Sequence, residues 1–516
     1  MAEQIHPNCA LPTDKAVVVI GAGTMGSGIA EVAASAGHHV YLRDTSEPAL
    51  ERGIGQIRRS LDKRVERGRI DAAQRDAIIA RLKPVNAEAK LSNVGLVIEV
   101  IVENLDIKVG VLSRIESEVE PDTIIATNTS SLSVTAIAGR LARPDRVVGM
   151  HFFNPATVLP LVEVVSGHAT APEVARTIVD TAKAWRKVPV ACRSTPGFIV
   201  NRVARPFYGE ALRLLQEQAA TPATLDAVMR DCGGFKMGPC ELMDLIGHDV
   251  NFAVTRSVYD GFFHDPRYKP SQIQKDLVDA GWLGRKNGRG FFDYRDGPAS
   301  PLPDDAGPTA KIPGRIRIEG DLGPASLLVD LLRRHDEIAV DRADGDGLLR
   351  VDGAAVALSD GRTATERSAA LGEPVVLFDL ALDYGACSRV ALAAPVHASG
   401  EHLGKAIGVF ATLGKRVSVM ADVPGLAVTR TVAMLVNEAA DAVYQGIASA
   451  DDVDAAMQKG VNYPIGPIAW GRRIGFRHVA TVLRHLAQAY GEERYRTSLW
   501  VQRAIHAEES LGGHRG

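Results

Sequence analysis

Residues 16–44, AVVVIGAGTMGSGIAEVAASAGHHVYLRD, decide the fold of the N-terminal part of the chain. The run AVVVI (16–20) is continuous and mostly β-branched, which is typical of a buried strand, and apolar residues at helical spacing follow it. The turn between them carries Gly21, Gly23 and Gly26 in the pattern G-x-G-x-x-G. The first glycine of this pattern permits the turn, the second lets backbone approach a pyrophosphate, and the third lets helix and strand pack closely. The stretch predicts a strand, a phosphate-binding turn and a helix.

An acid after the next strand predicts which dinucleotide binds. HVYLR (39–43) has the composition of a strand, and Asp44 at its end lies 18 residues beyond Gly26. An acid there binds the ribose 2′-hydroxyl of NAD and repels the 2′-phosphate of NADP. The alternative is a structural turn followed by a solvated aspartate. We expect NAD, held by Gly21, Gly23, Thr24, Met25, Gly26 and Asp44.

Strands and helices keep alternating as far as about residue 194. LVIEVI (96–101), TIIAT (123–127) and RVVGMHFF (146–153) have the composition of buried strands, and helical patterns lie between them. Such alternation predicts a parallel, doubly wound sheet, which binds ligands at the carboxyl ends of its strands. The polar side chains expected at that rim are Glu103, Asn104, Lys108, Asn128, Thr129, Ser130, Ser131 and His151.

His151 and Glu163 form a candidate catalytic pair. His151 lies near the end of one apolar run and Glu163 lies inside the next, where an unpaired charge would be costly to bury. A glutamate can fix one imidazole nitrogen as a donor and leave the other free to accept a proton. The alternative is a satisfied core histidine beside an edge-strand charge, and this stretch alone fits both interpretations.

The segment TPGFIVNR (195–202) predicts a second domain that is entirely helical as far as about Ala280. Thr195, Pro196 and Gly197 have the character of a cap and turn that opens a long helix through about Gln218. Asn201 lies in the first turns of that helix, where asparagine has poor propensity. We expect its amide to reach across a cleft between domains.

Residues 47–81 predict a helical pair inserted in the nucleotide-binding domain, with a break at 68–71. Ser60, Lys63 and Arg67 are three and four residues apart and so share one face of the first helix. That basic face suits a phosphate-bearing substrate such as coenzyme A. A solvated helix surface is the usual explanation of such a charge run and is the alternative.

Composition bounds the class of protein. A chain of 516 residues with 46% hydrophobic and 23% charged residues is a multidomain globular protein. The net charge of −3 gives no general attraction to nucleic acid or to membranes, and neither is expected as a partner. Five scattered cysteines indicate neither a disulfide framework nor a metal site. The N-terminal segment lacks the apolar core of a signal peptide, so we expect a cytoplasmic protein with a short leader.

The second half repeats part of the first. Residues 297–314 are rich in proline, glycine and aspartate and predict a linker, after which short apolar strands predict another α/β unit without a second G-x-G-x-x-G. A shift of 228 residues aligns PGFIVNR at Pro196 with PGLAVTR at Pro424, and the helical domain is thus duplicated. In the same register Asn201, His151 and Glu163 fall on Thr429, Asp379 and Ala391, so the copy lacks the catalytic residues.

These patterns give the expected domain organisation. It comprises a Rossmann-like NAD-binding domain with the helical pair (1–194), a helical substrate and dimerisation domain (195–296), the linker (297–314), a degenerate α/β domain (315–421) and a second helical domain (422–516). We expect the second half to be structural, packing on the first helical domain as a subunit would in a shorter dimeric relative.

Seven motifs in order carry a family resemblance: GAGTMG, IVENL, NTSSL, HFFNP with LVEV, TPGFIVNR, GPCELMDLIG and GRKNGRGFF. Over about residues 15–295 they resemble the 3-hydroxyacyl-CoA dehydrogenase family. The resemblance implies that His151 is the base and Glu163 its partner, and that Ser130 and Asn201 contact the substrate. It also implies cofactor contacts from Asp44, Glu103, Lys108 and Lys286, and a coenzyme A site at Ser60 and Arg67, where the family often has serine and lysine and Arg67 keeps the charge. We further expect Asn128 at the cofactor, Lys63 and Ser130 at coenzyme A, and a homodimer.

The expected reaction is the NAD-dependent oxidation of an (S)-3-hydroxyacyl-CoA to the 3-oxoacyl-CoA. Two alternatives are a dehydrogenase of a free hydroxy or sugar acid on the same fold, and a nucleotide-binding protein without turnover. The long form is similar to bacterial enzymes of 3-hydroxybutyryl-CoA metabolism or of 3-hydroxyadipyl-CoA in aromatic-acid breakdown such as phenylacetate catabolism. The sequence does not choose the acyl chain.

Overall fold

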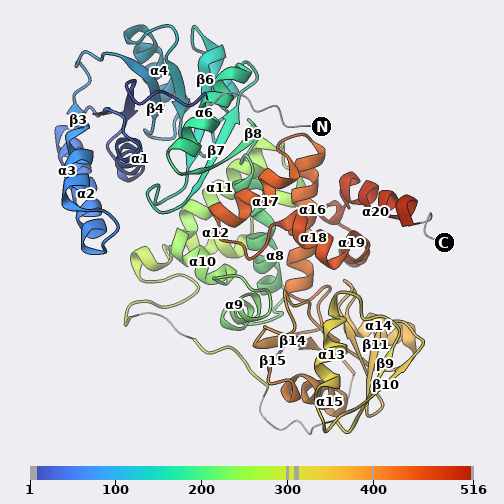
Figure 1. Ribbon diagram of the computed structural model, residues 1–516. Helices are drawn as coiled ribbons and strands as arrows, with labels where there is room; N and C mark the ends of the chain where they lie inside the picture. The colour runs from blue at the N-terminus through green and yellow to red at the C-terminus, as the bar shows by residue number, and fades with distance from the viewer. Residues whose placement is uncertain (1–8, 298–300, 307–312, 398–399, 513–516) are drawn as a thin grey trace. The chain divides into compact units, whose positions relative to one another are not determined.

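The computed structural model describes residues 9–297, 301–306, 313–397 and 400–512 (Figure 1). It divides into two compact units. The first contains the residues up to Arg202 together with Gln445–Val461, and the second contains Val203–Tyr444 together with the residues from Asn462 onwards. The start of the expected leader (1–8) and parts of the expected linker (298–300 and 307–312) lie outside the described residues. No helix in the described ranges is both long and apolar enough to cross a membrane.

The first unit is built on an eight-stranded sheet in the order β3-β2-β1-β4-β5-β6-β7-β8. Successive residues of a strand face opposite sides, so Val17 and Val19 enter the apolar core on one face of the sheet while Val18 and Ile20 enter the core on the other. Burial on both faces explains the continuous apolar run. The strands are β1 (Ala16–Ile20), β2 (Val40–Arg43), β3 (Leu82–Val85), β4 (Val94–Glu99), β5 (Ile124–Thr127), β6 (Val147–Phe152), β7 (Leu161–Ser166) and β8 (Val188–Arg193).

The expectation of a fully parallel sheet is wrong at one junction. The pairs from β3 to β6 are parallel, but β7 runs antiparallel to β6, and β8 is parallel to β7. The physical reason is the short connection between Phe152 and Leu161, since a parallel pair needs a crossover of a dozen or more residues. The reversal places the middle of β7 opposite the end of β6.

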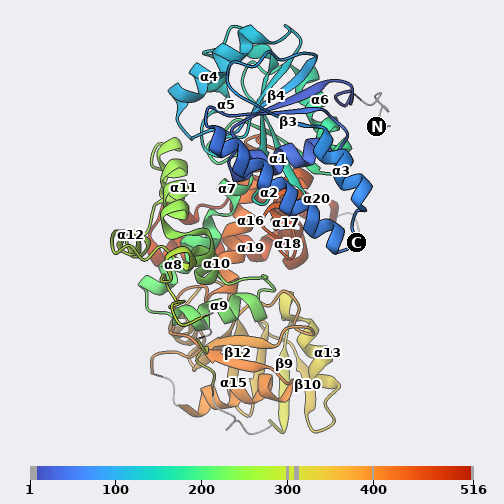
Figure 2. The same cartoon turned by 90° about the vertical axis from the view of Figure 1, so that its left-hand side faces the viewer.

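Helices cover both faces of this sheet. The core that contains Val17 is closed by α1 (Thr24–Ser35), α2 (Glu47–Glu66), α3 (Ala72–Ala80) and α6 (Pro172–Ala184). The opposite core is closed by α4 (Leu105–Glu118) and α5 (Val134–Ala138), and a 3-10 turn, η1 (Pro144–Arg146), leads into β6. The expected helical pair is confirmed as α2 and α3, which lie beside α1 (Figure 2). A capping box between Asp71 and Gln74 begins α3 after the break.

The expectation of one long helix from Thr195 to Gln218 is wrong. The chain forms a turn, then α7 (Val200–Val203) and α8 (Arg205–Gln216), and Pro206 stands in the first turn of α8, where its missing N–H costs no hydrogen bond. Thr195 does not cap a helix, since its buried hydroxyl has no hydrogen-bond partner. The region continues as α9 (Pro222–Asp231), α10 (Pro239–Ile246), α11 (His248–Gly261), η2 (Pro266–Tyr268), α12 (Gln272–Asp279) and η3 (Arg285–Asn287).

The second unit contains a seven-stranded sheet in the order β10-β9-β11-β12-β13-β14-β15. Its strands are β9 (Arg315–Glu319), β10 (Ala339–Ala343), β11 (Leu348–Val351), β12 (Ala354–Leu358), β13 (Val375–Phe378), β14 (Arg389–Ala393) and β15 (Arg416–Val419). The alanine-rich β12 was not predicted, because alanine gives little strand signal. The accompanying helices are η4 (Gly323–Ala325), α13 (Leu327–Arg333), α14 (Ala364–Leu371) and α15 (Gly400–Thr412).

Several elements of the second half follow those of the first at an offset of 228 residues, and η5 (Glu493–Tyr495) follows η2 at 227. Adding 228 to the bounds of α6 and α10 gives the bounds of α15 (Gly400–Thr412) and α18 (Pro467–Ile474). The strands β12 to β15 also pair in the parallel, antiparallel, parallel pattern of β5 to β8. The remaining helices are α16 (Val428–Tyr444), α17 (Ala450–Gly460), α19 (Phe476–Tyr490), η5 (Glu493–Tyr495) and α20 (Leu499–Gly512).

Candidate active site

The antiparallel pairing of β6 and β7 creates the candidate catalytic pair. His151 and Glu163 are direct cross-strand partners, so their side chains leave the sheet on the same face. His151 Nδ1 lies 2.7 Å from Glu163 Oε2, and both side chains are buried. Because the carboxylate accepts from Nδ1–H, Nε2 is left as the proton acceptor. Phe153 and Phe198 pack on the imidazole with ring centroids 4.5 and 5.9 Å away.

The second oxygen of Glu163 holds the beginning of α7. Oε1 accepts the backbone N–H groups of Ile199 and Val200 at 3.1 and 2.9 Å. A carboxylate from β7 therefore serves as the cap that the sequence assigned to Thr195. Both oxygens of Glu163 are engaged, and this fixes the carboxylate for its contact with His151.

Asn201 and Ser130 complete the group within the first unit. Asn201 Nδ2 donates to the backbone oxygen of Ser130 at 3.4 Å, which brings α7 against the turn that follows β5. The four residues expected to act on substrate, Ser130, His151, Glu163 and Asn201, are therefore brought together by the fold. All four lie in the first unit, so the expected reach of Asn201 across an interdomain cleft is replaced by a contact within that unit.

Glu103 holds the turn that carries Ser130. Its Oε1 accepts the hydroxyls of Thr129 and Ser131 at 2.5 and 2.9 Å and the backbone N–H of Ser130 at 3.0 Å. Burial favours the neutral form of Glu103, but the hydroxyl of Thr129 and the charge of Lys108 outweigh it and lower the pKa of the carboxyl group. Glu103 thus stays charged and shapes the rim of the sheet.

Lys108 and Asn128, two more residues expected at the cofactor, also make contacts within the protein. The ammonium of Lys108 is fully buried and lies 2.6 Å from Glu99 Oε1 and 3.2 Å from Glu103 Oε2. Asn128 Oδ1 accepts the backbone N–H of Phe152 at 2.8 Å and so ties the ends of β5 and β6 together. These contacts make both residues part of the frame of the site, and their cofactor role stays a prediction.

The glycine turn has the geometry that a dinucleotide needs. Gly21 has φ +107°, and a Cβ there would meet Val100 O at 2.5 Å, while a Cβ on Gly26 would collide with the Gly21 carbonyl. A Cβ on Gly23 would meet nothing within 4 Å, so this backbone faces open space at the start of α1. The first turn of α1, with Thr24 and Met25, has no side-chain cap, which leaves its N–H groups and dipole for an anion. These residues fit the pyrophosphate of NAD.

Asp44 lies beside a small apolar pocket at the end of β2. Its Oδ2 accepts the N–H of Ala22 at 2.8 Å and its Oδ1 accepts that of Ser46 at 2.9 Å, which places the carboxylate against the glycine turn. The pocket has a volume of about 150 Å³ and its mainly apolar lining includes Ile20, Ile101, Val111 and Ile115. An apolar slot next to an acid suits the adenine and ribose of NAD.

Lys286 is the expected cofactor residue that lies in the second unit. It belongs to η3 and pairs with Asp249 of α11. Asp244 of α10 organises the segment that follows, since it accepts the N–H groups of Phe291 and Phe292 at 2.9 and 3.0 Å. The role of Lys286 toward the cofactor stays a prediction.

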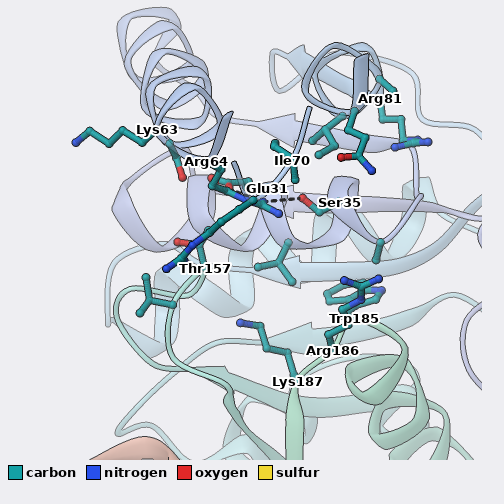
Figure 3. A pocket seen from close by; sticks show the side chains of 18 of the residues that line it. Glu31, Ser35, Lys63, Arg64, Ile70, Arg81, Thr157, Trp185, Arg186 and Lys187 are labelled. Carbon is teal, nitrogen blue, oxygen red and sulfur yellow. Dashed lines mark hydrogen bonds and ion pairs between the residues drawn. The ribbon is translucent and has the colours of Figure 1, made fainter. Parts of the chain in front are cut away.

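Ser60, Lys63 and Arg67, which their spacing placed on one helix face, line one pocket of about 800 Å³ in the first unit. Figure 3 shows this pocket, with Lys63 and Arg64 labelled on α2. Five further cations share the pocket, which is lined by segments of α1, α2, α3 and the chain before β8; they are Arg64, Arg69, Arg81, Arg186 and Lys187. Glu31 is the acid among them, and burial raises its pKa. Arg64 reaches from α2 toward Glu31 at 3.2 Å, and Lys187 comes from another wall. The positive excess suits a ligand with several phosphates.

Lys187 and Arg186 were missed by the sequence reasoning. Their signal is the short basic pair after Trp185, which is too brief to separate from an ordinary helix end. Lys187 Nζ donates to the carbonyls of Ala156 and, at 2.9 Å, Leu159, and so fixes the loop between β6 and β7. Burial lowers the pKa of Lys187.

The second half has a different group at the position of His151. Asp379 follows β13 and accepts the N–H groups of Ala427, Val428 and Thr429 at 3.0, 2.7 and 2.8 Å. Thr429, which takes the place of Asn201, also donates its hydroxyl to Asp379 at 2.8 Å. A carboxylate again holds the start of a helix, but no imidazole accompanies it. The second half therefore holds an aspartate and a threonine where the first half holds His151 and Asn201.

Comparison with family models covers most of the chain. Residues 16–195 match the model described as "3-hydroxyacyl-CoA dehydrogenase, NAD binding domain". The model of the C-terminal domain of 3-hydroxyacyl-CoA dehydrogenase matches twice, at residues 197–294 and 425–514. Residues 356–424 match the "3-hydroxybutyryl-CoA dehydrogenase reduced Rossmann-fold domain".

Individual relatives show the same pattern. The chain is 44% identical over 490 residues, 95% of its length and 97% of the relative's, to a 3-hydroxyadipyl-CoA dehydrogenase of Escherichia coli K12. It is 38% identical to a 3-hydroxybutyryl-CoA dehydrogenase of Clostridioides difficile, a match that covers 54% of this chain and 99% of that protein. The crystal structure of a 3-hydroxybutyryl-CoA dehydrogenase from Escherichia coli K12 superposes with a TM-score of 0.89 at 42% identity, covering 97% of this chain and all of that one.

Proposed function

The chain belongs to the 3-hydroxyacyl-CoA dehydrogenase family, and from this premise we propose which of its residues carry out the reaction. The enzyme is an NAD-dependent oxidoreductase that converts the hydroxyl group of a 3-hydroxyacyl-CoA to a ketone. The observation that carries the proposal is the cross-strand bond between His151 and Glu163, with Asn201 and Ser130 beside it. We take the (S)-alcohol as the substrate form.

In the proposed mechanism His151 is the general base. Its Nε2 takes the proton of the 3-hydroxyl, and Glu163 stabilises the imidazolium through the 2.7 Å contact at Nδ1. NAD, when bound, supplies the acceptor for the hydride that leaves C3. Ser130 and Asn201 hold the reacting oxygen and the thioester by hydrogen bonds, which orients the substrate before proton transfer.

The glycine turn and Asp44 are proposed to hold NAD. Gly21, Gly23 and Gly26 bring backbone and the N-terminus of α1 to the pyrophosphate, and Asp44 takes the adenosine ribose. Thr24 and Met25 contribute N–H groups from the first turn of α1. Glu103, Lys108, Asn128 and Lys286 are proposed to complete the cofactor site.

The basic pocket of α2 is proposed to bind coenzyme A through Ser60, Lys63 and Arg67. The excess of cations in this pocket supports a substrate that is attached to a phosphate-bearing carrier, as a coenzyme A thioester is. A free hydroxy or sugar acid would need no such pocket. A nucleotide-binding protein without turnover would need no buried histidine and glutamate pair. Both alternatives are therefore weaker than the thioester dehydrogenase.

The acyl group is proposed to be 3-hydroxybutyryl or 3-hydroxyadipyl, since relatives that span most of this chain are named for both. The second would place the enzyme in aromatic-acid breakdown, such as phenylacetate catabolism, in the cytoplasm. Comparing kcat/KM for acyl-CoA thioesters of rising length, with and without a terminal carboxylate, separates the two. A free carboxylate at the chain end raises kcat/KM only for the adipyl enzyme.

We also propose that residues 195–296 and 422–516 are two copies of one helical domain, which pair with each other inside one chain. Contacts in the second unit support this, because they occur in exchanged pairs. Tyr268 donates to Glu438 at 2.6 Å, and Tyr495 donates at 3.0 Å to Glu210, which is the equivalent of Glu438. Exchange of this kind is the signature of a self-complementary interface between two subunits.

This pairing bears on the expected homodimer. The self-complementary helical surface is used within the chain, so a dimer of whole chains would need another surface. The homodimer stays a prediction, and mass measurement in solution tests it, since one chain weighs 55.1 kDa. The degenerate α/β domain (315–421) is proposed to have a structural role.

The test of the proposed chemistry is His151→Gln, assayed with acetoacetyl-CoA and NADH. General acid-base help of this kind is worth about 10² to 10⁴ in rate, so most of kcat should be lost. NADH binding, measured by fluorescence titration, should stay close to that of the wild type because the glycine turn is untouched. Turnover near the wild-type rate in a folded variant would show that His151 is not the base.

A further inference from the structure

The first unit contains one segment from the second helical copy, residues 445–461, which comprise a loop and helix α17. This helix packs against β7 and β8 of the nucleotide-binding sheet. The backbone N–H of Arg193, the last residue of β8, donates to Ile447 O at 2.9 Å. A segment from the second half of the chain thus packs on the strand that carries Glu163.

The points of contact lie next to the catalytic residues. A Cβ on Gly460, the last residue of α17, would meet Leu161 Cδ2 at 2.5 Å and Val200 Cγ2 at 3.3 Å. Leu161 shares a face of β7 with Glu163, and the N–H of Val200 is one of the two that Glu163 accepts. Only glycine lets α17 come so close to both.

A second contact reaches the residue after Asn201. The guanidinium of Arg202 is buried, and its Nη1 donates to Gln445 Oε1 at 2.9 Å. Arg202 follows Asn201 on α7, so a guanidinium held at Gln445 limits the rotation of the short helix that carries the Asn201 amide. The loop before α17 therefore acts on α7 while Gly460 acts on β7.

We propose that Gln445 and Gly460 are positioning residues, supplied by the second helical copy, that hold Glu163 and Asn201 in place for the reaction. The proposal rests on the roles given above to Glu163 and Asn201. The second half of the chain then contributes to catalysis, although it contains no catalytic residue of its own. It does so through β7 and α7 and without touching the substrate.

The same contact recurs in the second unit, where it provides a matched control. Arg430, the equivalent of Arg202, donates through Nη1 to Glu217 at 2.9 Å, and Glu217 is the equivalent of Gln445. The N–H of Ala421 donates to Ala219 O at 2.9 Å, as Arg193 does to Ile447. The control contact lies beside Asp379 and Thr429, where there is no chemistry to disturb.

The experiment compares four variants of the full chain with acetoacetyl-CoA and NADH. Gln445→Ala and Gly460→Val should lower kcat on the order of 10- to 100-fold, the cost of a misplaced catalytic group, with NADH affinity unchanged. Gln445→Glu places at Arg202 the carboxylate that Arg430 already has, and should keep the wild-type kcat. Glu217→Ala should lower the unfolding midpoint and leave kcat unchanged.

The outcomes separate this inference from the proposed function. If Gln445→Ala and Gly460→Val are folded and turn over at the wild-type kcat, the positioning role is wrong, whatever His151→Gln shows. If Glu217→Ala loses kcat as much as Gln445→Ala, the effect is general destabilisation and the inference also fails. If His151→Gln keeps its turnover, the proposed function itself is overturned. Loss of kcat in Gln445→Ala with rescue in Gln445→Glu supports the positioning role.

Discussion

Glu163→Gln is a sharp test of the site because both carboxylate oxygens already accept hydrogen bonds. Oε2 faces His151 Nδ1 at 2.7 Å, and Oε1 faces the N–H groups of Ile199 and Val200 at 3.1 and 2.9 Å. Glutamine has one oxygen and one NH₂ group. Its NH₂ group must therefore face either the N–H of His151 or the backbone N–H groups of α7, and in both cases two donors meet. If the NH₂ faces His151, Nδ1 becomes an acceptor and the proton moves to Nε2, which can then no longer act as the base.

The lost charge sets the size of the effect. Two unit charges about 4 Å apart interact by about 4 kcal/mol at an effective dielectric constant of about 20. The imidazolium that forms as His151 takes the proton loses this stabilisation in the variant. Since about 1.4 kcal/mol corresponds to a tenfold change in rate, we expect kcat to fall by roughly 10² to 10³.

The assay is steady-state reduction of acetoacetyl-CoA by NADH, with NADH affinity measured separately. The glycine turn and Asp44 do not touch Glu163, so NADH should bind as it does to the wild type. A folded Glu163→Gln protein with unchanged kcat would show that the pair in β6 and β7 is a structural contact. A loss of NADH binding equal to the loss of kcat would place the defect in the fold of the first unit.

Three further results are expected. Asp44→Ala should lower kcat/KM for NAD⁺ by about 10- to 100-fold, the value of a hydrogen bond to a charged group, and a wild-type preference for NADP⁺ would contradict this role. Arg67→Ala should raise KM for acetoacetyl-CoA about tenfold, and it should not change the KM of a thioester that lacks the nucleotide. The control is Arg59→Ala, on the same helix but outside the pocket, which should change neither KM. Glu210→Gln should cost about 1.5–3 kcal/mol of stability, because the buried Arg430 guanidinium loses its charged partner at 2.6 Å and keeps Glu217. Burial opposes the charge of Glu210, but Arg430 and Arg494 lower its pKa, so this contribution is present above pH 4.5 and lost as pH falls through the lowered pKa. The stability difference from the wild type should therefore shrink in acid, and a difference that grows in acid would contradict the charge state.

Local sequence patterns predicted those parts of the site whose structure depends on residues close together in the sequence. The turn at Gly21 needs a positive φ and close backbone approach, and only a few residues around it determine both. The helical pair of α2 and α3 begins with local caps, at Ser46 and Asp71, and its basic face follows from spacing alone. These expectations were confirmed because each depends on neighbours in sequence.

The features that were missed depend on distant neighbours or on weak composition. The antiparallel direction of β7 follows from the short connection between β6 and β7. The alternation of strands and helices earlier in the chain predicted a parallel strand instead. The cap of α7 comes from Glu163, 37 residues before Val200, and so no local signal could name it. The contact between α17 and β7 joins the two halves of the chain, and neither sequence stretch alone predicts it.

Comparing Glu163 with Asp379 separates two roles of the carboxylate, which are to hold the start of a helix and to contact a histidine. In both halves a carboxylate from the sheet accepts N–H groups at the start of the following helix, so this task belongs to the fold. Within the described residues only the carboxylate of the first half also meets a histidine, and this second task is the one that we propose for the chemistry. His151→Gln removes the base and leaves the charged carboxylate on the N–H groups of Ile199 and Val200, whereas Glu163→Gln puts a neutral amide between the histidine and these groups. An unfolding midpoint lower in Glu163→Gln than in His151→Gln would show that the start of α7 needs the charged carboxylate, and a loss of kcat is expected in both variants.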